Sequence, residues 1–396
     1  MNFSSSARTP MMGLVLSGGG ARGAYQTGVL KATGEIAEGA GIEWPFQIMA
    51  GLSAGAINCG HLASSLTSLS QSTKQLAAIW SEISADKVFR TDPASLSVIG
   101  ARWVTSLASG GFTLGKKPQS LVDTSPLRRL ITHHLNPDNI DKNIANGRLH
   151  AVCISATEYS TSRGVSFVHA KPNANLWNRA RCFSIAQRLR PEHVMASSAI
   201  PILFPAIKIG ERFYGDGCLR NLTPLHPAIA LGATKLFVIG VRREMQLNDI
   251  PNPEKEGASA GRILSVLLNA VLMDGLEADL DNLKSINQIV TEYKCEGCRY
   301  KKIPVLVIRP SRDLSELAMD FESSIPTFVR YLTLGLGPIQ QTAEMISYLL
   351  FESEFCNALI ELGYNDAMNQ SHEISSFLSL KIQGEPDADI LKPSPP

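Results

Sequence analysis

Ser53 stands between two glycines, Gly51 and Gly55, in the pentapeptide GLSAG, which follows the apolar residues 46–50 and precedes a run that favours a helix. At a sharp turn from strand to helix, a serine hydroxyl projects out of the sheet, and small neighbours let the strained backbone pack closely. A chain with 31 glycines also contains such pentapeptides in ordinary turns. The pattern therefore predicts a nucleophilic serine only where the surrounding sequence agrees.

A second glycine cluster lies upstream, directly after the apolar residues 13–16. If the two strands are neighbours in a parallel sheet, both strand-to-helix corners open at the carboxyl edge, where open α/β sheets bind ligands. The N–H groups of the cluster would then lie beside Ser53 and stabilise the oxyanion that forms when a serine attacks an ester. The residues of this candidate oxyanion loop are Gly18, Gly19, Gly20, Arg22 and Gly23.

A serine nucleophile needs a base, and histidine is the usual one. No motif surrounds four of the eight histidines, which we expect to be surface or capping residues: His61, His133, His134 and His372. Asp216 is the better candidate, because it lies between Gly215 and Gly217 after the strand-like residues 206–213. Taken alone, Asp-Gly is also a signal for a hairpin turn.

The three motifs resemble, in the same order, those of the patatin-like phospholipases, a family of lipid acyl hydrolases that use a Ser-Asp dyad. The glycine cluster with Arg22 is similar to the family's oxyanion loop, and residues 51–55 are similar to its nucleophile elbow. Asp216 and Gly217 match its Asp-Gly motif. Cys218 departs from the pattern, since the family usually has Gly or Ala there. The similarity covers residues 11–310.

The resemblance implies a three-layer α/β/α fold with a central, mainly parallel sheet, followed by a helical C-terminal extension. It also implies phospholipase A or lysophospholipase activity, in which Ser53 attacks an acyl ester, Asp216 accepts its proton and the glycine loop holds the oxyanion. The implied partner is a phospholipid or lysophospholipid at a membrane surface, and no cofactor is implied. The same dyad would serve a lipid transacylase if an alcohol replaced water.

Other interpretations of the same residues stay open. His226 would complete a triad in the order Ser, Asp, His, although it follows Asp216 by only ten positions. The spacing of Gly18, Gly20 and Gly23 also satisfies a dinucleotide-binding fingerprint, but the next strand-like segment ends without the acid that would hold a ribose. A non-catalytic protein that binds lipid or nucleotide through this loop would usually lack the serine or the aspartate, and both are present.

The net charge of +1 argues against broad nucleic-acid binding, which requires a basic face. No stretch reaches eighteen uninterrupted apolar residues, so we expect no transmembrane helix. The apolar residues 11–16 are too short for the core of a signal peptide. We expect a cytoplasmic protein that is peripheral at membranes, with secretion by a non-classical route left open.

The seven cysteines are irregularly spaced, which predicts no disulfide framework in a chain of this length. Cys295 and Cys298 have the spacing of half a zinc site, but no second pair follows at a usable distance. Because Lys294 and Arg299 flank them, we expect a basic surface loop and no metal, with a redox disulfide as the alternative.

Strand and helix patterns alternate up to about residue 310, which indicates a catalytic domain over residues 11–312. Further strands are expected at residues 149–156, 164–169, 235–240 and 304–309. Residues 262–286 are expected to form one long helix, with its apolar part, 263–273, in the core.

Three segments lie outside this catalytic frame. Residues 90–115 are weakly charged and form a candidate lid or insertion. Residues 313–382 are expected to form a helical C-terminal extension that packs on the catalytic domain or on a membrane surface. The proline-rich residues 383–396 are expected to be disordered.

Overall fold

The computed structural model of the chain describes residues 11–90, 120–244, 259–292 and 300–379. Three expectations from the sequence concern residues outside these ranges. They are the candidate lid at 90–115, apart from its first residue, the Cys295 and Cys298 pair, and the tail at 383–396.

The described residues form an α/β fold around one mixed, mainly parallel sheet of nine strands. Its main path runs in the order β5-β4-β3-β2-β1-β8-β9, while β6 and β7 form a hairpin that joins the sheet at β3. The central strands β1, β2 and β8 are buried along their whole length, as expected for strands covered on both faces. The strands are β1 (Met12–Leu16), β2 (Ile48–Leu52), β3 (Ala151–Glu158), β4 (Arg163–Ala170), β5 (Cys182–Ala186), β6 (Ile207–Ile209), β7 (Arg212–Asp216), β8 (Lys235–Ile239) and β9 (Val305–Ile308).

The register places the ends of β2 and β7 head to head along one edge of β3. Because β4 pairs with the whole of β3 on one side, β2 and β7 share its other side. β2 ends with Leu52 opposite Ser155, and β7 ends with Asp216 opposite Ala156. The topology therefore brings Asp216 to the point where the chain leaves β2 and enters Ser53.

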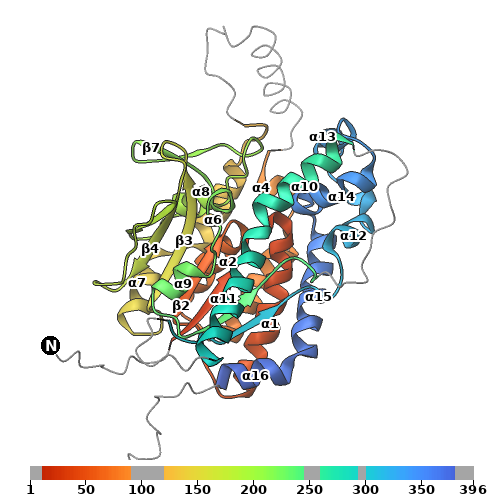
Figure 1. The fold of residues 1–396 in the computed structure, drawn as a ribbon. Coiled ribbons are helices and arrows are strands. Elements are labelled where there is room, and N and C mark those ends of the chain that lie inside the picture. The colour runs from red at the N-terminus through yellow and green to blue at the C-terminus, as the bar shows by residue number, and fades with distance from the viewer. Residues whose placement is uncertain (1–10, 91–119, 245–258, 293–299, 380–396) are drawn as a thin grey trace, which may run out of the picture.

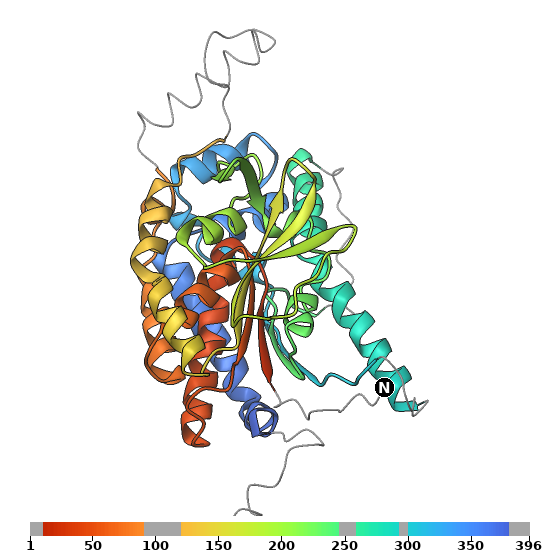
Figure 2. The same cartoon turned by 90° about the vertical axis from the view of Figure 1, so that its left-hand side faces the viewer.

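Helices cover both faces of the sheet, which confirms the expected three-layer arrangement (Figures 1 and 2). Alternate residues of β1 point to opposite layers: Leu14 and Leu16 belong to one hydrophobic cluster and Val15 to the other, as the strand's two-residue period requires. The larger cluster packs under α1 (Gly23–Gly39), α2 (Ala54–Ser64), α3 (Leu69–Ser81), α4 (Ala85–Val88), α6 (Ser125–His134), α7 (Pro137–Ala145) and α8 (Pro191–Ser197), and the smaller one under α9 (His226–Ala230) and α11 (Asp274–Glu292).

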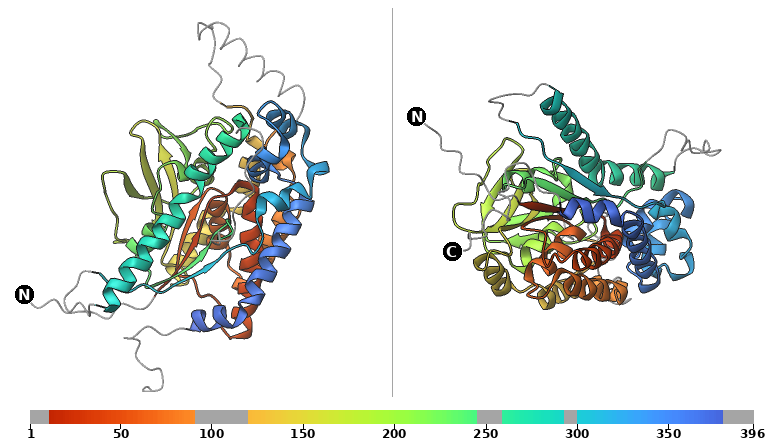
Figure 3. Two further views of the ribbon diagram at one scale, coloured as in Figure 1. Left: turned by 45° about the vertical axis from the view of Figure 1, so that its right-hand side comes forward. Right: turned by 90° about the horizontal axis from the view of Figure 1, so that it is seen from below.

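The C-terminal helices pack on the same face as α1 and share its core (Figure 3). α15 lies along α1, where the Tyr25 hydroxyl donates to Asp366 Oδ2 at 3.0 Å and the Tyr364 hydroxyl donates to Glu35 Oε2 at 2.7 Å. α14 packs against the 3-10 turn η1 (Gly20–Arg22) of the glycine loop. The helices of this region are α12 (Leu314–Met319), η3 (Glu322–Ser324), α13 (Thr327–Leu334), α14 (Ile339–Leu349), α15 (Ser353–Asn369) and α16 (Ser371–Ser379).

The sequence suggested one strand over residues 206–213, but these residues do not form one. They form β6 and the start of β7, joined by a turn at Gly210, whose φ is +60°. The reversal therefore occurs before the Asp-Gly pair, and Asp216 ends β7 and caps the 3-10 turn η2 (Gly217–Leu219).

The expectation of one helix over residues 262–286, with 263–273 in the core, is also wrong. The segment divides at Met273 into α10 (Ala260–Leu272) and α11, at the Asp-Gly pair 274–275, where both residues disfavour a helix interior. Only one stripe of α10 packs on the core, because the helix lies at the outside of the fold. Its other apolar side chains are between 39% and 56% exposed: Ile263, Val266, Leu267 and Val271.

Candidate active site

Ser53 forms the turn between β2 and α2, with φ 51° and ψ −119°. A positive φ at a residue other than glycine costs of order 1–3 kcal/mol and persists only where neighbours fix it. The end of α8 supplies two such neighbours. The Ser53 N–H donates to Ser197 Oγ at 2.9 Å, and Ser198 Oγ donates to the Ser53 carbonyl oxygen at 3.1 Å. Ser197 Oγ in turn donates to the Ser155 carbonyl oxygen at 2.6 Å, which ties the turn to β3.

The glycines around Ser53 permit close backbone contact. A Cβ on Gly55 would lie 2.3 Å from the carbonyl oxygen of Leu16, and a Cβ on Gly51 would lie 2.5 Å from the carbonyl oxygen of Gly55. Real Cβ atoms do not approach so closely, so glycine at 55 is needed for the first turn of α2 to pack on the end of β1, and glycine at 51 is needed for β2 to lie against that same turn. The expected role of both glycines therefore has a steric cause.

Asp216 is fully buried, and its two carboxylate oxygens differ. Oδ1 accepts the N–H of Cys218 at 2.9 Å, whereas Oδ2 makes no hydrogen bond with the described residues. Burial raises the pKa of Asp216 to about 6, while the Cys218 N–H and the Ser53 hydroxyl oppose the rise. The hydroxyl is thus close enough to affect the carboxylate without meeting full hydrogen-bond geometry, as is common for catalytic pairs without substrate.

The glycine loop lies against both candidate residues. A Cβ on Gly18 would lie 3.1 Å from Ser53 Cβ and 2.6 Å from Cys218 Sγ. Gly20 and Ser53 line one small cavity. The Cys218 thiol is buried between the loop and Asp216, and this burial raises its pKa well above the usual value, so that the residue stays a neutral thiol.

Arg22 makes its hydrogen bonds with residues other than Ser53 and Asp216. Its backbone N–H donates to the Gly19 carbonyl oxygen at 3.1 Å. Its guanidinium donates to Glu344 Oε1 at 2.8 Å and, through Nε at 2.9 Å, to Ser347 Oγ. The N–H of Gly23 bonds back within the turn, to the carbonyl oxygen of Gly20. Within the predicted loop, Arg22 therefore connects η1 to α14, and the segment from Gly18 to Gly20 lies nearest to Ser53.

The histidine alternative is not supported by the positions of the side chains. His226 begins α9 on the opposite side of the sheet from α2, and its ring packs edge to face with Trp177, with centroids 5.2 Å apart. Burial, with a smaller effect from Arg179, lowers the pKa of His226 to about 4. The partners of Asp216 are Cys218 and Ser53 instead.

The dinucleotide interpretation is not needed to explain the glycines of the loop. The carbonyl oxygen of Tyr348 in α14 lies 2.2 Å from the position of a Cβ on Gly20, and the Gly23 Cβ position lies 2.6 Å from Ala54 Cβ. Close packing within the chain therefore explains why both positions are glycine, without a bound dinucleotide. Among the described residues, no three His, Cys, Asp or Glu side chains are grouped so that they could hold a metal ion.

The model of the patatin-like phospholipase family matches residues 14–229, more than half of the chain. The chain belongs to the patatin-like phospholipase family. The matched segment includes the glycine loop, the Ser53 turn and Asp216. A search of curated proteins gave no significant match to this patatin-like chain.

Solved structures that resemble this patatin-like phospholipase share little sequence with it. VipD from Legionella pneumophila is 12% identical, with 92% of this chain and 67% of VipD covered and a TM-score of 0.33. Human GIVD cytosolic phospholipase A2 is 11% identical, with 93% and 59% covered and a TM-score of 0.43. The type III effector protein ExoU of Pseudomonas aeruginosa is 13% identical, with 89% and 54% covered and a TM-score of 0.30. This chain thus spans about half to two thirds of those chains.

The structure adds residues that sequence reasoning did not assign to the site. Ser197 and Ser198 lie at the end of α8, and their contacts with Ser53 cross 144 and 145 positions of sequence. Glu344 and Ser347 lie in the C-terminal helices, beyond the segment matched by the family model. No helix among the described residues of this patatin-like chain is both long and apolar enough to cross a bilayer.

Proposed function

We propose that the protein is a lipid acyl hydrolase of the phospholipase A or lysophospholipase type, with Ser53 as nucleophile and Asp216 as proton acceptor. The observation that carries the proposal is the contact of Ser53, held at φ 51°, with the fully buried carboxylate of Asp216. One oxygen of this carboxylate, Oδ2, makes no hydrogen bond with the described residues. Membership of the patatin-like phospholipase family supports the choice of ester and lipid chemistry.

In the proposed reaction, Asp216 Oδ2 accepts the Ser53 proton as Ser53 Oγ forms a bond to the ester carbonyl carbon. The N–H groups of the segment from Gly18 to Gly20 stabilise the negative oxygen of the tetrahedral intermediate. The carbon–oxygen bond to the alcohol then breaks, and the alcohol leaves with the proton from Asp216. Water attacks the acyl-enzyme in the same way, with its proton passing to Asp216, and the fatty acid and free Ser53 result.

The environment of Asp216 suits this role. A carboxylate at its ordinary pKa is a weak base for a serine hydroxyl, and a general base works best when its pKa lies near the working pH. Burial raises the pKa of Asp216 to about 6, so the group is still ionised at neutral pH but is a stronger base than an exposed aspartate.

Action at a lipid surface is supported by the exposed face of α10. This helix contacts η2, which begins at the catalytic carboxylate, and it carries four exposed apolar side chains on its outer side. Contiguous exposed apolar surface of this kind marks a site of contact with protein or lipid. We propose that this face rests on the lipid aggregate that presents the substrate.

The test is release of free fatty acid from mixed phospholipid vesicles, with products identified by mass. We expect release by the wild type and none by Ser53→Ala, while Ser285→Ala, at an exposed position of α11, acts as the matched control. Asp216→Asn should also abolish release, and His226→Ala should retain most of it. Equal release by the wild type and Ser53→Ala would refute the proposal, and acyl transfer to an added alcohol would show a transacylase instead.

A further inference from the structure

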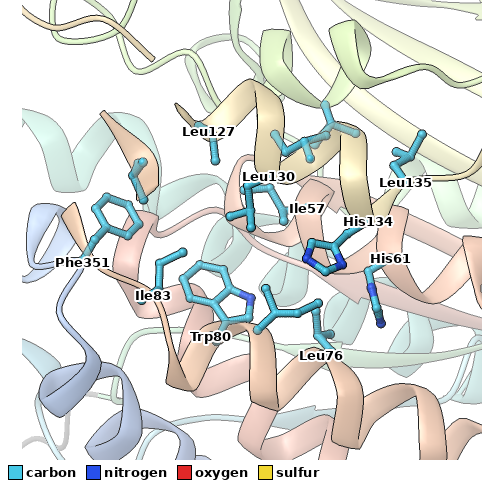
Figure 4. A pocket seen from close by; sticks show the side chains of 14 residues that line it. Ile57, His61, Leu76, Trp80, Ile83, Leu127, Leu130, His134, Leu135 and Phe351 are labelled. Carbon is cyan, nitrogen blue, oxygen red and sulfur yellow. The ribbon is translucent and has the colours of Figure 1, made fainter. Parts of the chain in front are cut away.

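A narrow apolar slot lies next to the Ser53 cavity, in the layer between α2, α3 and α6 (Figure 4). The cavity and the slot share five lining residues, so they lie next to each other: Ile57, Trp80, Val88, Leu127 and Phe351. Figure 4 shows Phe351 at one end and the histidines His61 and His134 at the other.

The slot follows the axis of α2. Ser53, Ile57 and His61 are spaced four residues apart, which places them on the same face of the helix. Since a helix rises about 1.5 Å per residue, the eight positions from Ser53 to His61 span about 12 Å. The nucleophile therefore lies at one end of the slot and His61 marks the other.

The lining between these ends is apolar. The indole N–H of Trp80, the polar atom nearest the middle, is occupied by a hydrogen bond to Asn58 Oδ1 at 2.8 Å. At the far end, the rings of His61 and His134 lie edge to face with centroids 6.0 Å apart. Neither ring nitrogen of His61 has a partner among the described residues. The slot thus ends at a polar group.

We propose that the slot binds the acyl chain of the substrate and that the His61 and His134 pair limits the favoured length to a medium chain. An extended chain of carbon atoms with bonds of about 1.52 Å and angles of about 111° advances about 1.25 Å per carbon, so about ten carbons span the distance to His61. The inference rests on the proposed hydrolase function, since it assigns the acyl side of that reaction.

Two features favour an unbranched chain over other ligands. The interior volume of the slot is only about 30 Å³, which is too small for an alkyl chain as the side chains stand, so a single chain enters only when the aliphatic side chains turn aside, and a bulky group is excluded. Burial lowers the pKa of His61 to about 4, helped by the neighbouring His134. The ring is therefore neutral at working pH and offers no charge to an anionic headgroup. Carbons of an acyl chain that extend beyond the ring gain no apolar contact.

The test measures kcat/KM for p-nitrophenyl esters from butanoate to hexadecanoate, below their micelle concentrations. Each buried methylene favours binding by an amount equivalent to about fourfold in kcat/KM. We expect this increase to continue up to decanoate and then stop. Leu130→Trp fills the slot from α6, away from Ser53, and should lower the ratio of decanoate to butanoate activity more than tenfold.

The histidine pair is tested by His61→Leu and His134→Leu, which replace the polar end with an apolar one. Both variants should move the limit to longer chains, while His372→Leu, at an exposed position of α16, should leave the profile of the wild type. A profile that is flat, or that none of these variants changes, would overturn the inference while leaving Ser53-dependent hydrolysis intact.

A different result would separate this inference from the proposed function. If no ester is hydrolysed in a Ser53-dependent manner, the hydrolase proposal fails, and the slot is then tested by calorimetric binding of hexanoate and decanoate to the full-length Ser53→Ala protein. Tighter binding of decanoate that Leu130→Trp abolishes would support the acyl slot. Equal binding of the two acids, or none, would overturn it.

Discussion

Arg22 of the glycine loop and Glu344 of α14 form an ion pair of 2.8 Å across 322 positions of sequence, and the Arg22 side chain is almost fully buried. The guanidinium also lies over the Tyr348 ring, 4.3 Å from its centroid. The C-terminal helices thus hold the turn that precedes α1. The loop beside Ser53 is therefore positioned by a part of the chain that lies outside the segment matched by the family model.

Glu344→Ala should weaken both stability and activity, because it leaves the buried Arg22 charge without its partner. Removing one member of a buried pair costs about 3–5 kcal/mol, and the partial exposure of Glu344 points to the lower end. Urea denaturation measures the loss, and ester hydrolysis should fall more than tenfold as the loop loses its anchor. Glu361→Ala, at an exposed position of α15, is the control; equal behaviour of the two variants would argue against the anchor.

The pH profile of kcat/KM should have an acidic limb with a midpoint near pH 6. In the proposed reaction only ionised Asp216 can accept the Ser53 proton, and burial raises the pKa of Asp216 to about 6. Activity should therefore be low below that pH and rise as the carboxyl loses its proton. Cys218→Ala removes a thiol that helps to oppose the rise, so it should move the limb to higher pH, whereas a limb near pH 4 would contradict this account.

The sequence predicts the main elements of the candidate site because glycines mark its tight turns and close backbone contacts. Gly55 is required by the carbonyl oxygen of Leu16, and the Asp-Gly pair lies at the end of β7. The supporting contacts could not be predicted in this way. The bond from Ser53 to Ser197 and the pair of Arg22 with Glu344 join distant segments, and neither serine nor glutamate has a distinctive spacing.

The α10 segment shows a different limit of sequence reasoning. Its apolar residues predict a helix in the core, but hydrophobicity alone does not say whether a helix has neighbours on all sides. One stripe of α10, with Leu264 and Leu268, packs on the core, and Leu267 on the other side is more than half exposed. Only the arrangement of α10 outside α14 and η2 decides this outcome.

Ser197→Ala should lower activity about tenfold or more without unfolding the protein. The change removes the acceptor for the Ser53 N–H and the donor to the Ser155 carbonyl oxygen, and an unsatisfied buried group costs about 1–3 kcal/mol. The strained turn would then relax and move the hydroxyl away from Asp216. Hydrolysis rates and circular dichroism are measured together, with Ser285→Ala for comparison; unchanged rates in folded Ser197→Ala would count against the proposed restraint.

Leu267→Glu should lower activity on vesicles more than activity on a monomeric ester. Loss of one leucine from a lipid contact, at about 1.5–3 kcal/mol, corresponds to about tenfold or more in the ratio of the two rates. Ile289→Glu, which is as exposed but lies on α11, is the matched control. A ratio that falls equally in both variants would mean a general charge effect and not contact through α10.

Asp216→Asn should make the protein more stable above pH 6, although it removes the proposed base. The pKa of Asp216 rises from an ordinary 3.8 to about 6 on folding because the carboxyl is buried, so the folded state holds the proton more tightly than the unfolded chain. The wild type accordingly loses stability as pH rises from about 4 to 6, by roughly 3 kcal/mol for two pKa units. Asparagine has no such transition, so urea denaturation at a series of pH values should show a difference of up to about 3 kcal/mol at pH 8 that shrinks steadily toward pH 4. Asp281→Asn, at an exposed position of α11, should run parallel to the wild type. A difference in the free energy of unfolding between Asp216→Asn and the wild type that does not change with pH would show that folding does not raise the pKa of the Asp216 carboxyl.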